Sequence, residues 1–223
     1  MAADQVGMPT PAAEERLAGR LAAQQPGGPG TARAKAITAL TELGQIDRAV
    51  YRAVADTPTP VLDPPLRRLS TVADRSRLWL GVAAAMAAAG GPAGRHAAGA
   101  GLVAIAVDSA VVNVGFKFAA RRRRPDREAA GVPALRQVPM PHSASFPSGH
   151  TASGFAFANA VGQSLPMAAA PLRLLASAVG YSRVHTGVHY PGDVVLGAVI
   201  GASIGELVGW GLSRLGQAGA KAR

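Results

Sequence analysis

Long apolar runs alternate with short polar clusters along most of the chain, and this pattern predicts a bundle of helices. The apolar runs cover Ala97–Phe116, Thr151–Leu165, Leu172–Tyr181 with its flanks and Asp193–Leu212. The first is about twenty residues long, which matches the thickness of a bilayer. We therefore expect several of these helices to cross a membrane.

The segments that precede these runs are less apolar. Ile37–Ala55 is amphipathic, which is typical of a bundle helix or of a helix lying in the membrane interface. Asp56–Arg77 is rich in proline and charge and is expected to be a connection that holds a short helix, and Leu78–Gly90 is apolar but short for a span. The predicted fold is all-α, an integral membrane bundle of about six helices.

The chain of 223 residues is long enough for one domain with a substantial core. We place that domain at residues 37–214, between a flexible N-terminal tail (1–36), rich in Pro, Gly and Gln, and a C-terminal tail (215–223). No secretory signal is recognised in the first residues. A secreted soluble form is therefore not expected.

Composition and charge narrow the class of protein. Apolar residues make up 48% of the chain but aromatic residues only 4%, and alanine and glycine are very frequent. Such a high content of small residues is typical of closely packed membrane helices. A net charge of +10 predicts a polyanionic partner, namely anionic lipid, a phosphorylated substrate or nucleic acid. The absence of cysteine excludes disulfides and thiolate metal sites.

The last apolar run has a glycine at every fourth position, and this spacing places the four on one helix face: Gly197, Gly201, Gly205 and Gly209. Such a stripe permits close backbone approach, and we favour packing within the bundle over a homodimer interface. Asp108 and Glu206 lie inside apolar runs, where structural pairing or exposure at a helix end is favoured over catalysis.

Three polar clusters fall at the ends of predicted helices: "KFAARRRRPD" from Lys117, "PSGH" at Pro147–His150 and "SRVHTGVHYPGD" at Ser182–Asp193. If successive helices alternate in direction, the first two clusters share one face of the bundle. Two further crossings return the chain to that face at the third cluster. The three clusters are therefore expected to converge into one site.

The chemistry of the clusters points to phosphate. Lys117, Arg124 and Arg183 supply cations, and guanidinium groups bind phosphate oxygens in a bidentate manner. Ser148 and Gly149 open a helix, where a hydroxyl and free N–H groups favour an anion. These groups suit the charge that develops during phosphoryl transfer.

The remaining groups suit acid, base and nucleophile roles. His189 can accept a phosphoryl group on one ring nitrogen, and Asp193, four residues later, can hold the other nitrogen. His150 can then protonate the leaving oxygen as general acid. The rival interpretation is a metal site at His185, His189 and Asp193, spaced like ligands on one helix face. Pro191 argues against it, because a proline interrupts such a helix.

The arginines at positions 121–124 favour a cytoplasmic flank by the positive-inside tendency, or an anionic-lipid or nucleic-acid patch. Basic residues also lie at the opposite ends of the predicted helices. Charge alone therefore leaves the orientation of the chain open.

The three clusters, in this order and spacing, resemble the motifs of the type 2 phosphatidic acid phosphatase (PAP2) superfamily. "KFAARRRRP" fits K-x6-R-P, "PSGH" fits as written, and "SRVHTGVHYPGD" fits S-R-x5-H-x3-D. The superfamily includes membrane lipid phosphatases, soluble acid phosphatases and vanadium haloperoxidases. The resemblance covers about Ala97–Leu212.

The resemblance implies a role for each matching residue. The phosphate ligands it implies are Lys117, Arg124, Ser148, Gly149 and Arg183. It also implies His189 as nucleophile, His150 as acid and Asp193 as the partner of the nucleophile. Catalysis would need no metal and no cofactor, and membrane members commonly have six helices and a site on the extracytoplasmic face.

The expected function is hydrolysis of a lipid phosphate or diphosphate by a multi-pass enzyme of the cell membrane, through a phosphohistidine. Polyprenyl phosphates or diphosphates, phosphatidate and phosphatidylglycerophosphate present the same group, so the sequence does not name the lipid. Nucleic acid is not the expected partner. A haloperoxidase-like enzyme, a non-catalytic lipid-binding protein, transfer to an acceptor other than water and a homo-oligomer stay open.

Overall fold

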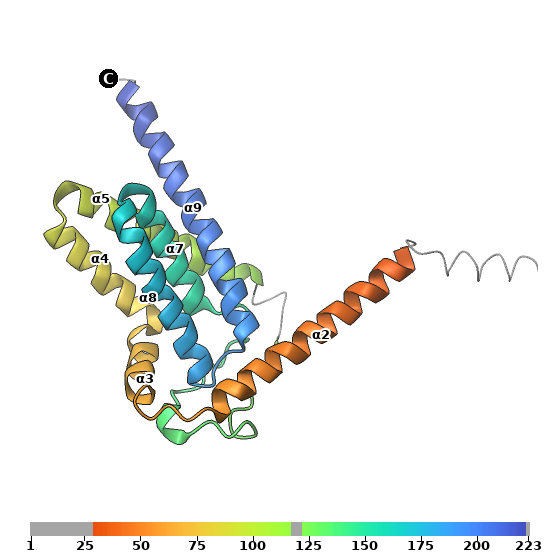
Figure 1. The fold of residues 1–223 in the computed structure, drawn as a ribbon. Helices are drawn as coiled ribbons and strands as arrows, with labels where there is room; N and C mark the ends of the chain where they lie inside the picture. The colour runs from red at the N-terminus through yellow and green to blue at the C-terminus, as the bar shows by residue number, and fades with distance from the viewer. Residues whose placement is uncertain (1–28, 117–121, 222–223) are drawn as a thin grey trace, which may run out of the picture. The chain divides into compact units, whose positions relative to one another are not determined.

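The computed structural model describes residues 29–116 and 122–221, and these residues form helices and loops without a strand (Figure 1). The α-helices are α2 (Pro29–Asp56), α3 (Asp63–Val72), α4 (Arg77–Ala89), α5 (Gly91–Ala110), α7 (Gly149–Ser164), α8 (Pro166–His185) and α9 (Pro191–Lys221). The all-α prediction is confirmed. Helix α3 is the short helix expected within the connection at Asp56–Arg77.

The helix ends follow local sequence signals. Proline occupies the first turn of α3, α5, α8 and α9, where its missing N–H is not needed. Gly91, the first residue of α5, has a φ of +60°, a conformation that glycine adopts readily, and it allows the chain to turn after α4. Beyond Ala110, α5 continues as a π-helix over Val111–Phe116. Residues 1–28 of the predicted tail lie outside the described residues, and so does Lys117 of the predicted site.

Contacts divide the chain into two units, Met1–Ile46 and Asp47–Arg223. The described part of the first unit is the beginning of α2. The second unit holds the last turns of α2 and all the later helices. All of the predicted site residues that the structure describes belong to this second unit.

Helix α7 is the centre of the second unit, where it contacts α5, α8 and α9 (Figure 1). Its small residues allow this close packing, and Ala152, Ala156, Ala158 and Ala160 are fully buried. Trp79 of α4 lies against Phe157 with ring centroids 5.5 Å apart. The polar residues at the start of α7 are therefore held by neighbours on several sides.

The glycine stripe of α9 packs against α7, as predicted. A Cβ at Gly197 would lie 2.6 Å from the Ser148 carbonyl oxygen. A Cβ at Gly201 would likewise collide with the Ala152 carbonyl, so only glycine permits this approach. The close packing fixes the start of α9, with Asp193, next to the start of α7.

One described stretch, Pro191–Ala218 of α9, is long and apolar enough to cross a membrane, with a mean hydropathy of 1.7 in its most apolar window. Glu206 interrupts it. This side chain is half exposed, lies 3.6 Å from Arg173 and accepts a hydrogen bond from Gln163. It therefore forms the structural pairing that the sequence favoured.

Candidate active site

The described parts of the three polar clusters lie together at one end of α7. Arg124 of the first cluster has its Nη1 3.2 Å from His189 Nε2 of the third. The Ser148 N–H of the second donates to the Asp193 carbonyl at 2.9 Å. Lys117 lies outside the described residues, and the other predicted site residues are brought to this one place.

His189 has the environment of a neutral nucleophile. Its side chain is buried, with Nδ1 3.5 Å from Asp193 Oδ2 and Nε2 facing the Arg124 guanidinium. These neighbours favour the tautomer with hydrogen on Nδ1 and a lone pair on Nε2. Burial, helped by Arg124 and Arg183, lowers the pKa of His189 to about 4, against the opposing effect of Asp193. The ring is therefore unprotonated at neutral pH.

Asp193 is fixed by donors on both of its oxygens. Its Oδ2 accepts from the Ser145 hydroxyl at 2.5 Å and from the Tyr190 N–H at 2.9 Å. Its Oδ1 accepts from Arg122 at 2.8 Å, and Arg122 also pairs with Asp47 at 2.5 Å. A fully buried carboxylate with this many donors keeps its charge and its orientation toward His189.

Arg124 is anchored by backbone carbonyls rather than by a carboxylate. Its Nε donates to Ser143 O at 2.9 Å and its Nη1 to Val188 O at 2.8 Å. No described carboxylate pairs with it, so its positive charge is not neutralised within the described residues. A cation held in this way beside His189 Nε2 suits an incoming anion.

Arg183 is buried at the end of α8 with part of its hydrogen-bonding capacity unused. Its Nη1 donates to the Ser70 hydroxyl at 2.8 Å and to the Ser70 carbonyl at 3.2 Å. Its Nε is buried and has no hydrogen-bond partner in the described part of the chain. A buried donor without a partner is unfavourable, which is expected where a ligand completes the site.

The start of α7 leaves room for an anion. Ser148 is fully buried and its Oγ accepts from Thr151 at 3.0 Å, which leaves its own hydroxyl hydrogen for another acceptor. A Cβ on Gly149 would meet only Val112, at 3.9 Å. The space at this helix N-terminus is therefore not filled by the described residues, and its first N–H groups favour negative charge.

His150 pairs with Asp74, a residue that the sequence analysis did not identify. The Nε2 atom lies 2.7 Å from Asp74 Oδ1, which is also 3.7 Å from Arg183. The hydrogen bond from His150 lowers the pKa of Asp74. Burial lowers the pKa of His150 below its ordinary value, while Asp74 opposes this shift.

Asp74 lies two residues beyond the end of α3 and begins a short helical turn, Asp74–Ser76, with an unusual backbone. The next two residues, Arg75 and Ser76, have φ of +52° and +59°, in the left-handed region that side chains disfavour. Such conformations often occur at functional sites. This feature is visible only in three dimensions.

Three further polar contributors were also missed: Ser145, Arg122 and Asp47. Ser145 is two residues before Pro147 and Arg122 lies in the arginine run, so both carried a positional signal. Asp47 is on a helix far away in sequence and carried none. Its Oδ1 accepts from the Gly192 N–H at 2.6 Å, which connects α2 at Asp47 to the start of α9.

The structure disfavours the rival metal arrangement. Helix α8 ends at His185 and α9 begins at Pro191, with Gly187 at φ of +75° between them, so the residues do not share a helix face. His185 Nε2 instead lies 3.0 Å from Asp63 Oδ1. This hydrogen bond occupies one of the two ring nitrogens that a metal ion could use.

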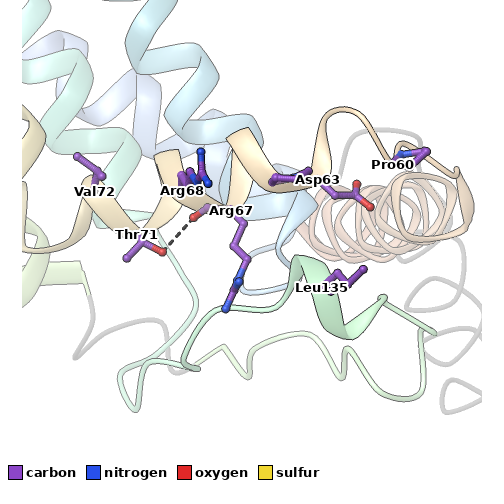
Figure 2. A pocket seen from close by; sticks show the side chains of 8 residues that line it. Pro60, Asp63, Arg67, Arg68, Thr71, Val72 and Leu135 are labelled. Carbon is purple, nitrogen blue, oxygen red and sulfur yellow. Dashed lines mark hydrogen bonds between the residues drawn. The ribbon is translucent and has the colours of Figure 1, made fainter.

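Two of the cavities in the described part of the chain lie next to the site, and a third lies apart from it. One of about 310 Å³ adjoins Gly149 and His150, and an apolar groove of about 440 Å³ runs past Thr151 and Pro191 along α9. A third, of about 400 Å³, lies between α3 and Leu135 (Figure 2). It contains none of the predicted site residues, and Arg67 and Thr71 in it are joined by a hydrogen bond within α3.

Two solved structures resemble this fold. A transmembrane PAP2 type phosphatidylglycerolphosphate phosphatase from Bacillus subtilis matches with a TM-score of 0.59 and 23% identity, over 78% of this chain and 87% of that one. Aquifex aeolicus LpxE matches with a TM-score of 0.58 and 26% identity, over 72% and 92%. The first likeness concerns the fold alone.

Two of the relatives found by sequence comparison are phosphatases by name. Decaprenylphosphoryl-5-phosphoribose phosphatase of Mycobacterium tuberculosis is 38% identical over 101 residues, 44% of this chain and 51% of that protein. Lipid A 1-phosphatase of Porphyromonas gingivalis is 34% identical over 110 residues, 48% of this chain and 22% of that protein. The chain thus spans about half the length of the first relative and less than a quarter of the length of the second.

The family model of the PAP2 superfamily matches residues 97–215, which is more than half of the chain. This range contains the three polar clusters and the helices that position them. The chain belongs to the PAP2 superfamily.

Proposed function

We propose that the chain is a multi-pass membrane phosphatase that removes phosphate from a lipid phosphate or diphosphate without a metal ion. The observation that carries this proposal is the environment of His189. A guanidinium without a carboxylate partner among the described residues lies 3.2 Å from its Nε2, and a fixed carboxylate lies 3.5 Å from its Nδ1. This arrangement suits a nucleophile that attacks a bound anion.

In the first step, the Nε2 lone pair of His189 attacks phosphorus and the bond to the leaving oxygen breaks. His150 supplies a proton to that oxygen, so that a lipid phosphate loses the free alcohol and a lipid diphosphate loses the lipid monophosphate. The ring of His189 becomes positively charged, and Asp193 stabilises it through Nδ1–H. Arg124, Arg183 and Lys117 bind the phosphate oxygens, together with the opening of α7.

In the second step, water attacks the phosphohistidine. His150, now without its proton, accepts one from this water, and the N–P bond breaks to release inorganic phosphate. His189 returns to its neutral form. The two steps transfer one phosphoryl group to water and restore every residue.

A lipid substrate is supported by the surroundings of the site and by the relatives. The apolar groove beside Thr151 and Pro191 and the apolar stretch of α9 suit contact with hydrocarbon. The named relatives act on decaprenylphosphoryl-5-phosphoribose and on lipid A. A site on the extracytoplasmic face, as the family resemblance implies, is part of the same proposal.

The test is phosphate release by the purified protein in detergent with EDTA, from phosphatidate, phosphatidylglycerophosphate and a polyprenyl diphosphate. We expect release from at least one lipid, and its loss in His189→Ala. His96→Ala is the matched control, because His96 is exposed near the start of α5, whereas the site lies near the end of that helix. Loss of activity in EDTA would contradict a metal-free mechanism, and full activity of His189→Ala would contradict the assigned nucleophile.

A further inference from the structure

The cavity next to His150 contains polar groups that phosphate binding does not use. It has a volume of about 310 Å³, and its polar lining comprises Arg75, Ser76, Asp108, Ser109, His150 and Ser153. These residues come from the turn before α4, from α5 and from α7. The cavity therefore extends away from the phosphate site on the side of the acid.

Asp108 is the most unusual of these groups. It lies on α5, where its side chain is 1% exposed, and its Oδ2 accepts from the Ser153 hydroxyl at 2.9 Å. Its Oδ1 has no hydrogen-bond partner in the described part of the chain. A buried carboxylate oxygen requires a donor, and the described side chains supply a donor to only one of the two carboxylate oxygens of Asp108.

The geometry of phosphoryl transfer assigns this cavity to the leaving group. Attack by His189 and departure of the leaving oxygen occur on opposite sides of phosphorus. The leaving oxygen must then be next to His150, which protonates it. The first atoms of the departing alcohol consequently enter the cavity that His150 lines.

We propose that this cavity binds a leaving group that carries free hydroxyls, such as a glycerol or sugar unit between the terminal phosphate and the lipid. This inference rests on the proposed function. A hydroxyl on the carbon next to the ester donates to the Asp108 carboxylate, and Ser153 is held in place as a second polar contact. A substrate whose leaving group carries no further hydroxyl would instead bury the Asp108 carboxylate against methylene groups.

The test compares kcat/KM for phosphatidylglycerophosphate and phosphatidate with the same acyl chains. The leaving group of the first lipid is phosphatidylglycerol, which carries a free hydroxyl already present in the substrate. The leaving group of the second lipid is diacylglycerol, whose only hydroxyl is the one formed by the reaction. We expect the full-length enzyme to prefer the first by about tenfold or more, because a site that binds a hydroxyl discriminates against a substrate lacking it.

Asp108→Leu should reduce this preference about tenfold, chiefly by slowing the first substrate. Ser153→Ala should act in the same direction with a smaller effect, and it remains informative where Asp108→Leu does not fold. Ser203→Ala is the matched control, because Ser203 is exposed on α9 and its hydroxyl donates to Val199 O within the same helix. It should leave the preference unchanged.

Equal kcat/KM values for the two lipids, or an equal loss on both in Asp108→Leu and Ser153→Ala, would overturn the inference and leave the proposed phosphatase function intact. Absence of phosphate release from every lipid by the wild-type enzyme would overturn the proposed function, and the inference with it. The two failures are thus distinguishable.

Discussion

The two histidines of the site are held in different ways. His189 is 2% exposed, and its partner Asp193 receives hydrogen bonds from a hydroxyl, an N–H and a guanidinium. His150 pairs with one described carboxylate, that of Asp74, whose side chain is 47% exposed. The difference suits the two proposed tasks, because a nucleophile forms a bond at one defined point whereas a general acid must serve alcohols that enter and leave.

The largest effect is expected at His189, the more firmly held of the two histidines. Replacing His189 by alanine removes the atom that we propose accepts the phosphoryl group, so kcat should fall by about 10⁴-fold or more for every substrate. The measurement is phosphate release from a lipid phosphate and from p-nitrophenyl phosphate. A variant that kept substantial activity on either substrate would show that another group attacks phosphorus.

The loss of kcat on replacing His150, the proposed acid, should depend on the substrate. His150→Ala is expected to lower kcat by about 10²- to 10⁴-fold for a lipid alkyl ester, because the leaving alkoxide then lacks a proton. For p-nitrophenyl phosphate the loss of kcat should be much smaller, since that leaving group is stable as an anion. Equal losses on the two substrates would remove the distinction between the two histidines.

Asp74→Asn should change the pH dependence more than the maximum rate. The Asp74 carboxylate raises the pKa of His150 against the effect of burial, so its removal lowers that pKa further. The protonated acid is then lost at lower pH, and the alkaline limb of the kcat/KM profile moves to lower pH. On that limb, at neutral pH, kcat/KM should fall about tenfold for each pH unit by which the limb moves.

The comparison for Asp74→Asn is Asp56→Asn, which changes another acidic side chain outside the described site. An alkaline limb that stayed in place in Asp74→Asn, with only the thermal stability reduced, would assign Asp74 a purely structural role.

The smallest effect is expected at Ser145, which donates to Asp193 from one side. Ser145→Ala removes one of several donors to this carboxylate, and the others retain it near His189. We expect kcat to fall about tenfold, as for one hydrogen bond to a charged group, with little change in KM. Ser145→Thr, which keeps the hydroxyl, should restore part of the rate, and failure to do so would argue against the hydrogen bond as the cause.

Most of the fold followed from the apolar pattern, because α5, α7, α8 and α9 pack against one another. The glycine stripe of α9 is the clearest case, since four glycines on one face are hard to explain except by close helix packing. The convergence of the three clusters followed from the alternating direction of the helices. The arrangement of Arg124, Ser148 and His189 therefore needed only motif order and helix parity.

The supporting residues could not be predicted in the same way. Asp74 reaches His150 through a turn whose left-handed backbone leaves no mark in the sequence, because Arg75 and Ser76 are ordinary residue types. Asp47 acts on Gly192 and Arg122 across the fold, so its role depends on tertiary packing alone. Residues that support a site through long-range contacts are identified only when those contacts are seen.

The central claim is that His189 carries the phosphoryl group, and rapid acid-free quenching of the enzyme with a ³²P-labelled lipid phosphate tests it most directly. The expected result is a base-stable, acid-labile phosphoenzyme whose label maps by mass spectrometry to the peptide containing His189. It should be absent from His189→Ala. Label on another residue, or turnover with no phosphoenzyme at any time resolved by the quench, would contradict the proposed mechanism.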